Sequence, residues 1–310
     1  MSESSEVFTR LIARNAKLPP LPTAVVHPCD PESLKGALLA RRRRLIAPVL
    51  VGPEAKIRRV AAEARVSVRD CPIVATPHSH AAAQAAVALA RGGEVECLMK
   101  GSLHTDKLMG AVLDGDTGLR TERRVSHVFV MNVATYPRPL LITDAAVNID
   151  PDLEAKRDIV QNAIDLAHAL GIARPRVAIL SAVETVTPKL RSTIDAAALC
   201  KMADRGQIRG GSLDGPLAFD NAISEAARRA KGITSSVAGR PDILVVPDLE
   251  AGNMLVKQLQ YLAHAKSAGI VLGATVPIVL TSRADSAASR LASCAIAALL
   301  RAHTLRRRVA

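Results

Sequence analysis

The chain has 310 residues, of which 49% are hydrophobic, and it carries a formal net charge of +12 with a sequence pI near 10.0. This length allows one large domain or two of ordinary size, and the hydrophobic content suffices for a folded core. With no Trp, two Tyr and three Phe, that core must be aliphatic, as where Ala-rich helices cover parallel strands. No apolar run reaches the ~18 residues of a membrane-spanning helix, and the acidic, polar start is unlike a signal peptide.

The five cysteines and eight histidines indicate neither a disulfide framework nor a metal site. The cysteines are odd in number and widely spaced with no CxxC motif, which is typical of a protein in the reducing cytoplasm. His78 and His80 form the only close histidine pair, and no partnered carboxylate motif accompanies them.

The basic excess is concentrated in two arginine runs, at residues 41–44 and 306–308. Such a charge suits nucleic acid, an anionic membrane surface or small anionic substrates. Neither run alternates with aromatic residues, so stacking on bases is not favoured. The runs are read as a solvated helix end and a basic tail, with the first run also able to attract a polyanionic ligand such as a nucleotide cofactor.

Strand-like and helix-like segments alternate along the chain with short turns between them. We expect strands at 23–27, 45–51, 71–75, 97–99, 125–132, 139–143, 176–181, 243–246, 270–272 and 275–280. We expect helices at 31–41, 54–63, 80–91, 106–113, 152–170, 189–205, 219–231, 251–268 and 286–301. This order predicts an α/β fold with a parallel or mixed sheet covered by helices on both faces.

A domain boundary is expected near residues 134–139, where two prolines interrupt the alternation. The final helix can pack back on the first part of the chain. We therefore predict a discontinuous first domain, residues 1–137 plus 272–310, and a second domain at 138–271.

The strand at 275–280 ends abruptly at Ser282, Arg283 and Asp285. Open α/β folds bind ligands beyond the carboxyl ends of their strands. Arg offers a planar fork to phosphate, Ser can donate to a developing negative charge, and Asp can take a proton. The structural alternative is that Ser282 caps a helix starting at Ala284, with Arg283 and Asp285 as ordinary residues of its first turn.

Two further strand ends carry polar groups. Lys100 leads into a turn that contains Ser102 and His104 and opens a helix, a setting that suits an anion or is simply a strand–helix loop. Asn253 and Lys257 are spaced i, i+4 on the helix after the strand at 243–246, so they line a cleft together or share a solvent face.

Other segments favour turns. Asn148 and Asp150 lie in a strand-to-helix turn, and the segment 210–224 is expected as a loop that could close over a ligand. The sequence contains no GxxxxGK[ST], no strand-linked GxGxxG and no GxSxG elbow. A P-loop, a dinucleotide-binding fingerprint and a hydrolase nucleophile elbow are therefore not visible.

Seven segments together carry a family resemblance: LMKGSLHTDKLMGAVL, RRVSHVFVMNV, LLITDAAVNIDPD, VAILSAVET, GGSLDGPLAFDNAIS, DILVVPDLEAGNMLVKQL and PIVLTSRADS. In these segments the chain resembles the phosphate acetyl/butyryltransferases, which exchange an acyl group between coenzyme A and inorganic phosphate. The resemblance implies a two-domain, three-layer αβα fold similar to that of isocitrate and isopropylmalate dehydrogenases. It also implies an active site in the interdomain cleft and, commonly, a homodimer.

The resemblance places the family's catalytic Ser-Arg pair on Ser282 and Arg283. The acetyl-type branch has its basic Asp seven positions after the Ser, where this chain has Ser289, so the expected general base is Asp285. Substrate-binding roles are expected for Lys100, Ser102, His104, Arg124, Asn253 and Lys257, with Arg124 holding phosphate.

The expected reaction is reversible transfer of an acetyl or butyryl group in a ternary complex, with acyl-CoA and phosphate as substrates and no metal or redox cofactor. No nucleic-acid or membrane partner is expected. One alternative is a metal- and NAD-dependent decarboxylating dehydrogenase of the same fold, which needs a cluster of Asp residues. Another is a basic nucleic-acid-binding or acyl-CoA-sensing protein.

Overall fold

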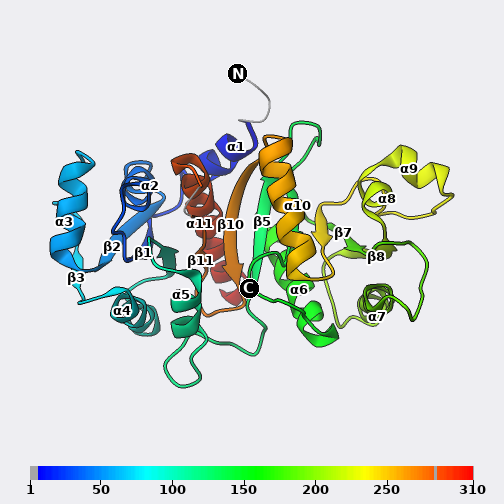
Figure 1. Cartoon of the computed structure of the whole chain (residues 1–310), viewed down its shortest axis with the longest axis horizontal. Helices are drawn as coiled ribbons and strands as arrows, with labels where there is room; N and C mark the ends of the chain where they lie inside the picture. Colours follow the sequence, from blue (N-terminus) through cyan, green and yellow to red (C-terminus); the bar gives the residue numbers. More distant parts are fainter. Residues whose placement is uncertain (1–5, 283–284, 310) are drawn as a thin grey trace. The chain divides into compact units, whose positions relative to one another are not determined.

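The computed structural model of the chain describes residues 6–282 and 285–309 (Figure 1). The chain divides into two compact units. Unit 1 comprises residues 1–7 and 124–267, and unit 2 comprises residues 8–123 and 268–310. The boundaries drawn from the sequence lie at 137/138 and 271/272.

Unit 2 contains strands in the order β3-β2-β1-β4-β11-β10. Their bounds are β1 Leu21–Val26, β2 Ile46–Gly52, β3 Ile73–Ala75, β4 Cys97–Lys100, β10 Lys266–Leu272 and β11 Ile278–Val279. All neighbouring pairs are parallel except β10 with β11. The helices are α2 Pro31–Arg42, α3 Glu54–Glu63, α4 Ser79–Arg91, α5 Thr105–Val112 and α11 Ala287–Val309. Helix α2 packs against α11, whereas α4 packs against α5 and covers β1 and β2 (Figure 1).

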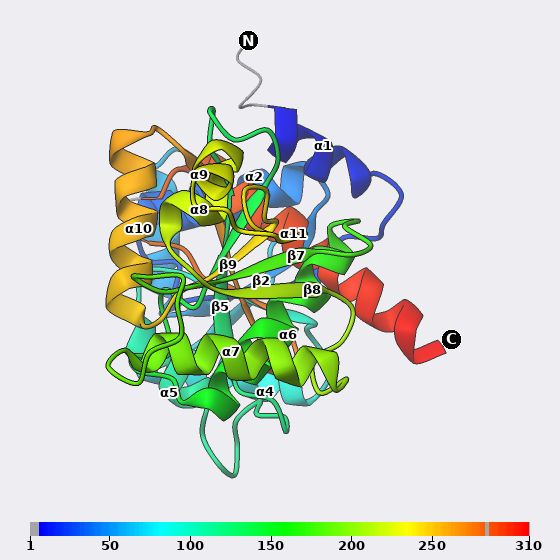
Figure 2. The ribbon, with the colours of Figure 1, turned by 90° about the vertical axis from the view of Figure 1, so that its right-hand side faces the viewer.

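Unit 1 contains strands in the order β5-β6-β9-β7-β8. Their bounds are β5 Ser126–Asn132, β6 Leu140–Thr143, β7 Arg176–Leu180, β8 Ser212–Leu217 and β9 Ile243–Val245. Strand β5 is antiparallel to β6, and the other pairs are parallel. The helices are α6 Leu153–Ala169, α7 Arg191–Asp204, α8 Phe219–Ile223, α9 Glu225–Ala230 and α10 Leu249–Leu262. Helices α6 and α7 lie on one face of these strands, and α8 and α9 on the other (Figure 2).

Local sequence explains where several helices begin. Asp30, Asp152 and Asp248 precede α2, α6 and α10, and each side chain accepts a hydrogen bond from a backbone N–H of the first turn. Pro31 occupies the first helical position of α2, where its missing N–H costs nothing. These caps hold the helix starts close to the strand ends that precede them.

The cores are aliphatic, as the composition predicts. The unit 1 core is built from residues such as Ile142, Leu180 and Leu244, and the largest fully buried side chains of unit 2 include Leu50, Leu98 and Met99. Sheets between two helix layers in each unit confirm the predicted αβα fold class.

Three predicted elements were wrong. The expected helix 219–231 is broken at Ser224, whose extended backbone ends α8 and whose hydroxyl caps α9. The expected loop at 210–224 contains strand β8, which lies at a sheet edge where Pro216 removes no required N–H donor. The expected helix 251–268 ends at Leu262, because His264 takes a left-handed conformation (φ 50°) and residues 266–272 form β10.

Helix α1, Glu6–Arg14, was not predicted, because the sequence offers no clear start signal there. All five cysteines are free thiols, as predicted, and four of them are buried. None of the helices described in residues 6–282 and 285–309 has the length and apolar content to cross a membrane.

Candidate active site

Three parallel strands of unit 2 end side by side. Val26 of β1 pairs with Lys100 of β4, and Val279 of β11 pairs with Met99 of β4. The residues that directly follow these strands therefore reach the same edge of the sheet, which is the edge where open α/β folds bind ligands. They are His27, the turn 101–104 and the loop that contains Ser282.

The loop after β11 is closed by two hydrogen bonds between Ser282 and Asp285. The N–H of Ser282 donates to Oδ2 of Asp285 at 2.6 Å, and the N–H of Asp285 donates to the Ser282 carbonyl at 3.2 Å. Ser282 is exposed and Asp285 is partly buried. Arg283, the predicted partner of Ser282, lies outside the described residues.

Helix α11 begins at Ala287, after this loop rather than inside it. The hydroxyl of Ser286 accepts a hydrogen bond from the N–H of Ser289 at 3.1 Å and so caps the helix. Ala284, where the structural alternative places the start of the helix, lies outside the described residues. Ser282 and Asp285 belong to the loop between strand and helix.

The turn after β4 is tied to the residue after β1. The backbone N–H and the hydroxyl of Ser102 both donate to the His27 carbonyl at 2.9 Å. The strands approach so closely that a Cβ at Gly101 would lie 2.5 Å from the same carbonyl oxygen, so only glycine fits. Lys100 ends β4 as a buried residue, 5% exposed, whereas His104 is exposed at the position before α5.

His27 was not predicted as a site residue, although it follows a strand. Its Nδ1 lies 2.9 Å from the Ser102 hydroxyl oxygen. Because the hydroxyl proton is directed at the His27 carbonyl, we infer that Nδ1 donates and that Nε2 is the acceptor nitrogen of the neutral ring. Its place directly after a buried strand was the signal that could have identified it.

Burial is the main reason why the pKa of His27 lies below its ordinary value of 6.5. The charges of Lys56 on α3 and Lys107 on α5 lower this pKa further, while Asp30 before α2 acts in the opposite direction. The neutral ring is thus favoured near neutral pH, which suits hydrogen-bond acceptance or proton transfer.

In unit 1, Arg124 precedes β5 at the sheet edge where the antiparallel strand β6 ends. Its Nε donates to Oδ1 of Asn148 at 2.7 Å, and Nδ2 of Asn148 donates to Oδ2 of Asp144 at 2.6 Å. The Asp144 carboxylate also accepts from the N–H groups of residues 146–148. Arg124 is thereby held by a buried, ordered loop even though its own side chain is exposed.

The same edge of unit 1 contains the start of α10. Nδ2 of Asn253 lies 3.4 Å from the Ala145 carbonyl, and a Cβ at Gly252 would lie 2.8 Å from the Ala145 Cβ. Arg124 and Asn253 therefore both border the loop after β6. Lys257 lies one turn further along α10, where its Nζ donates to Gln260 at 3.2 Å.

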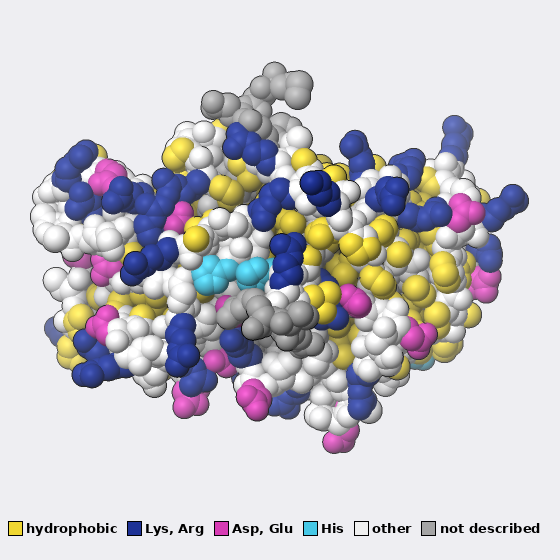
Figure 3. All heavy atoms as spheres, turned by 180° about the vertical axis from the view of Figure 1, so that it is seen from behind, with side chains coloured by type: hydrophobic (Ala, Val, Ile, Leu, Met, Phe, Trp, Pro, Cys, Tyr) yellow, Lys and Arg dark blue, Asp and Glu magenta, His cyan; other side chains and the backbone are white. Residues whose placement is uncertain are grey.

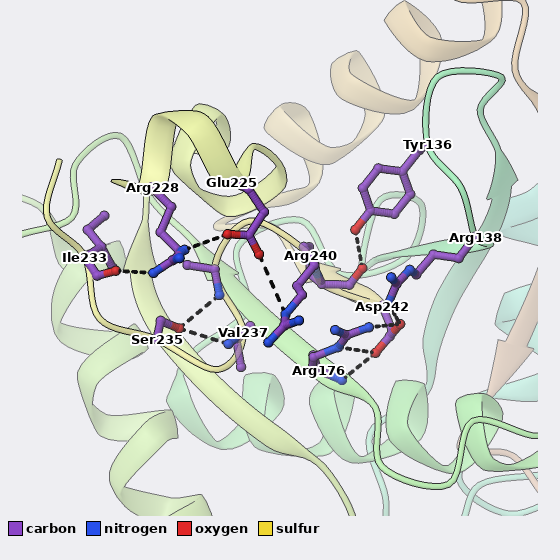
Figure 4. Close-up of polar contacts among 12 residues, drawn as sticks. Tyr136, Arg138, Arg176, Glu225, Arg228, Ile233, Ser235, Val237, Arg240 and Asp242 are labelled. Carbon is purple, nitrogen blue, oxygen red and sulfur yellow. Dashed lines mark hydrogen bonds and ion pairs between the residues drawn. The ribbon is translucent and has the colours of Figure 1, made fainter. Parts of the chain in front are cut away.

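A second polar network lies at the opposite ends of the unit 1 strands (Figure 4). Asp242, directly before β9, accepts from the backbone N–H, Nε and Nη2 of Arg176 at 2.9, 3.0 and 3.1 Å and from Nη1 of Arg138 at 3.3 Å. Nearby, Glu225 pairs with Arg228 and Arg240. Since each carboxylate is paired with two arginines and Asp242 directly precedes a strand, we interpret this network as a structural brace.

The metal-ligating and nucleophilic side chains of the described residues do not indicate a second candidate active site. Among the residues described, no group of three or more His, Cys, Asp and Glu side chains is arranged to hold a metal ion. Burial raises the pKa of Cys97 and of Cys200 to about 12, so these thiols stay protonated and weakly nucleophilic.

Basic side chains are dispersed over the surface in the view of Figure 3, with acidic side chains between them. The first arginine run forms the end of α2, where positive charge is favourable, and Arg41 pairs with Asp70 at 3.4 Å. This arrangement fits the predicted solvated helix end.

The two units and the loops that follow their strands define an α/β enzyme. Its candidate site residues lie mainly at the carboxyl ends of the strands. Residues 73–298 match the family described as phosphate acetyl/butaryl transferase. A phosphate acetyltransferase from Rhizobium meliloti is 66% identical over 303 residues, which cover 98% of this chain and 95% of the relative. The chain belongs to the phosphate acetyl/butaryl transferase family, as its sequence segments predict.

Solved structures agree with this assignment. A branched-chain phosphotransacylase from Enterococcus faecalis V583 is 30% identical, with a TM-score of 0.78 and coverage of 91% of this chain and 99% of that structure. A putative 4-hydroxythreonine-4-phosphate dehydrogenase from Salmonella typhimurium is 13% identical, with a TM-score of 0.59 and coverage of 91% and 99%, and shares the fold alone. The dehydrogenase-like fold class predicted from the sequence is thus confirmed.

Proposed function

We propose that this enzyme catalyses the reversible transfer of a short acyl group between coenzyme A and inorganic phosphate. The observation that carries the proposal is the 66% identity, over 98% of the chain, to a protein named phosphate acetyltransferase. The same observation favours acetyl over butyryl as the acyl group. The comparisons support a transferase and give no support to the dehydrogenase or nucleic-acid-binding alternatives.

The loop after β11 supplies the catalytic residues of this proposal. In the direction of acyl-CoA synthesis, Asp285 takes the proton from the coenzyme A thiol, and the thiolate sulfur attacks the acyl-phosphate carbonyl carbon. The bond from that carbon to the bridging oxygen then breaks, and phosphate leaves with the bonding electrons. Since Oδ2 of Asp285 accepts from the Ser282 N–H, we assign the proton transfer to Oδ1.

Ser282 and Arg283 act on negative charge in the same step. Arg283 holds the phosphate as it leaves, because its guanidinium fork matches phosphate oxygens. Ser282 donates to the oxyanion or to a phosphate oxygen. Both substrates are bound at once, so positioning and fixed electrostatics supply the rate enhancement without a covalent enzyme intermediate.

Substrate binding is assigned to residues at the two strand edges. In unit 2 these are Lys100, Ser102 and His104 after β4. In unit 1, Arg124 holds a phosphate group, and its fixed contact with Asn148 supports this role. Asn253 and Lys257 on α10 complete the substrate-binding residues.

Coenzyme A thioester and phosphate are the proposed substrates, with no resident metal or redox cofactor. We also propose a cytoplasmic homodimer. Exposed Met254, Tyr261 and Leu262 on α10 support the dimer, because they follow the i, i+7, i+8 spacing of one helix face and are 58%, 67% and 80% exposed. Light scattering of the purified protein measures this assembly directly.

The testing experiment follows release of coenzyme A thiol from acetyl-CoA and butyryl-CoA, with and without phosphate, in the wild type and in Arg283→Ala. We expect phosphate-dependent release, faster with acetyl-CoA, and a loss of ~10²–10³ in kcat in the variant because the transition-state charge loses its partner. If neither thioester gives phosphate-dependent release, the proposed reaction is wrong for these acyl groups.

A further inference from the structure

A buried arginine lies directly beneath the Ser282 loop. Arg290, in the first turn of α11, is 3% exposed. Its Nη1 donates to the Thr281 hydroxyl at 2.7 Å, and Nη1 and Nη2 donate to the Ser282 carbonyl at 3.4 and 3.2 Å. The Arg290 side chain thus hydrogen-bonds two consecutive residues, Thr281 and Ser282, that precede the helix.

This arginine is not a conventional buried ion pair. Its Nη atoms donate to a hydroxyl and a carbonyl oxygen, and its buried Nε has no hydrogen-bond partner among the described residues. Burying a guanidinium against a hydroxyl and a carbonyl alone is costly, and methionine or leucine would fill the same space at lower cost. We infer that Arg290 is kept despite this free-energy cost because it hydrogen-bonds Thr281 and Ser282.

A glycine on another helix makes room for the arginine stem. Gly36 lies inside α2, where glycine is less favourable than alanine. A Cβ at position 36 would lie 2.6 Å from Cδ and 3.3 Å from Cβ of Arg290, so no larger residue fits while the arginine keeps its place. Gly36 and Arg290 therefore act as one packing unit, although they are distant in the sequence.

The Ser282 carbonyl receives hydrogen bonds from two sides. The N–H of Asp285 reaches it from within the loop, and Arg290 reaches it from the helix. The peptide that carries this carbonyl is also the one that leads on to Arg283. Its orientation therefore bears on how Ser282 and Asp285 face a substrate.

Resting on the proposed transferase function, we propose that Arg290 is a positioning residue that orients the Ser282–Asp285 loop, with Gly36 making the space it needs. Arg290 touches neither substrate in this proposal. It acts through the Thr281 hydroxyl and the Ser282 carbonyl. Its loss should therefore lower kcat and leave the KM values for acyl-CoA and phosphate nearly unchanged.

The test compares Arg290→Met, Arg290→Lys, Gly36→Ala and the double variant Gly36→Ala/Arg290→Met with the wild type. We expect Arg290→Met to lower kcat by ~10–100-fold, and Arg290→Lys to recover part of this loss because an ammonium can reach one of the two acceptors. Gly36→Ala should lower kcat several-fold by displacing the arginine stem. In the Arg290→Met background it should have no further effect.

The matched control is Arg301→Met. Arg301 lies on the same helix, is largely buried, and has a carboxylate partner in Glu96 at 2.9 Å. Its loss should affect thermal stability but not kcat. The positioning role is refuted if Arg290→Met lowers thermal stability without lowering kcat. It is also refuted if the losses in kcat of Gly36→Ala and Arg290→Met multiply in the double variant.

A second readout does not depend on the reaction. Hydrogen exchange of the Ser282 and Asp285 amides should become at least ~10-fold faster in Arg290→Met, because the loop loses its anchor. Unchanged exchange would overturn the proposal even if the wild type showed no transferase activity. If the wild type is inactive but amide hydrogen exchange is faster in Arg290→Met, the proposed reaction is refuted and the role of Arg290 in holding Ser282 and Asp285 is supported.

Discussion

Two polar networks of this enzyme use arginines in contrasting ways. In the brace of unit 1, Asp242 is surrounded by guanidinium and backbone N–H donors, so the buried negative charge is compensated (Figure 4). Beside Ser282 in unit 2, the buried Arg290 donates instead to a hydroxyl and a carbonyl oxygen. The first network precedes its strands, and the second follows a strand.

The contrast shows where this fold tolerates an unbalanced charge. A compensated network at the amino ends of strands contributes to stability, because every buried charge has a partner. At the carboxyl ends, the proposed positioning role accounts for the burial of Arg290, which has no carboxylate partner in the part of the chain that the structure describes. Variants in the two networks should therefore separate stability from activity.

The largest expected effect on stability comes from Asp242→Asn in the brace. This change leaves Arg176 and Arg138 without their carboxylate, so the free energy of unfolding should fall by about 3 kcal/mol. Urea unfolding measures the loss, and kcat of the folded enzyme should stay unchanged. Glu225→Gln is the control, since the more exposed Glu225 should contribute less than about 1 kcal/mol. A fall in kcat without loss of stability would assign Asp242 to the active site.

A smaller effect, on substrate affinity, is expected at the edge of unit 1. Arg124→Ala should raise KM for phosphate about tenfold, because a charge-assisted hydrogen bond is worth roughly 1.5–3 kcal/mol. Steady-state kinetics with varied phosphate measures this change. Arg157→Ala is the matched control, since Arg157 pairs with Asp158 in the same unit. Equal KM values in both variants would remove Arg124 from the phosphate site.

The smallest expected effect concerns His27 and pH. Its pKa is lowered in the folded state, so the unfolded chain binds the proton more readily. The contribution of His27 to stability is therefore complete above about pH 6.5 and is lost as the pH falls below it.

Thermal unfolding at about pH 7.5 and about pH 5.5 tests this expectation. The decrease in Tm on acidification should be smaller in His27→Gln than in the wild type, and His80→Gln on the exposed start of α4 should behave like the wild type. An equal decrease in all three proteins would show that His27 does not titrate in this range.

The sequence predicted regular elements well where local signals are strong. Helix α3 matches its expected span, 54–63, because Pro53 and the apolar spacing mark both the start and the buried face. Strand β8 was missed because Gly215 and Pro216 read as a turn, and only its place at a sheet edge permits them. The end of α10 was missed because Ala265 and Ala268 suit a helix as well as a buried strand.

The site was predictable in part for a similar reason. Ser282 and Asp285 stand out because polar groups interrupt an apolar strand, and their hydrogen bonds to each other are local. The contact between Gly36 and Arg290 leaves no such local signal, since two distant segments create it. His27 and Ser102 likewise meet only because β1 and β4 pair.

Unit 2 is formed by two separate stretches of the chain, so it cannot complete its fold until the second stretch has been synthesised. Strand β11 completes its pairing with β4, and α11 its packing with α2, only after everything between them has been synthesised. Unit 1 has nearly all its residues available earlier. During translation the loop that contains Ser282 is thus synthesised near the end, and a shortened chain that stops before residue 268 lacks the proposed catalytic residues.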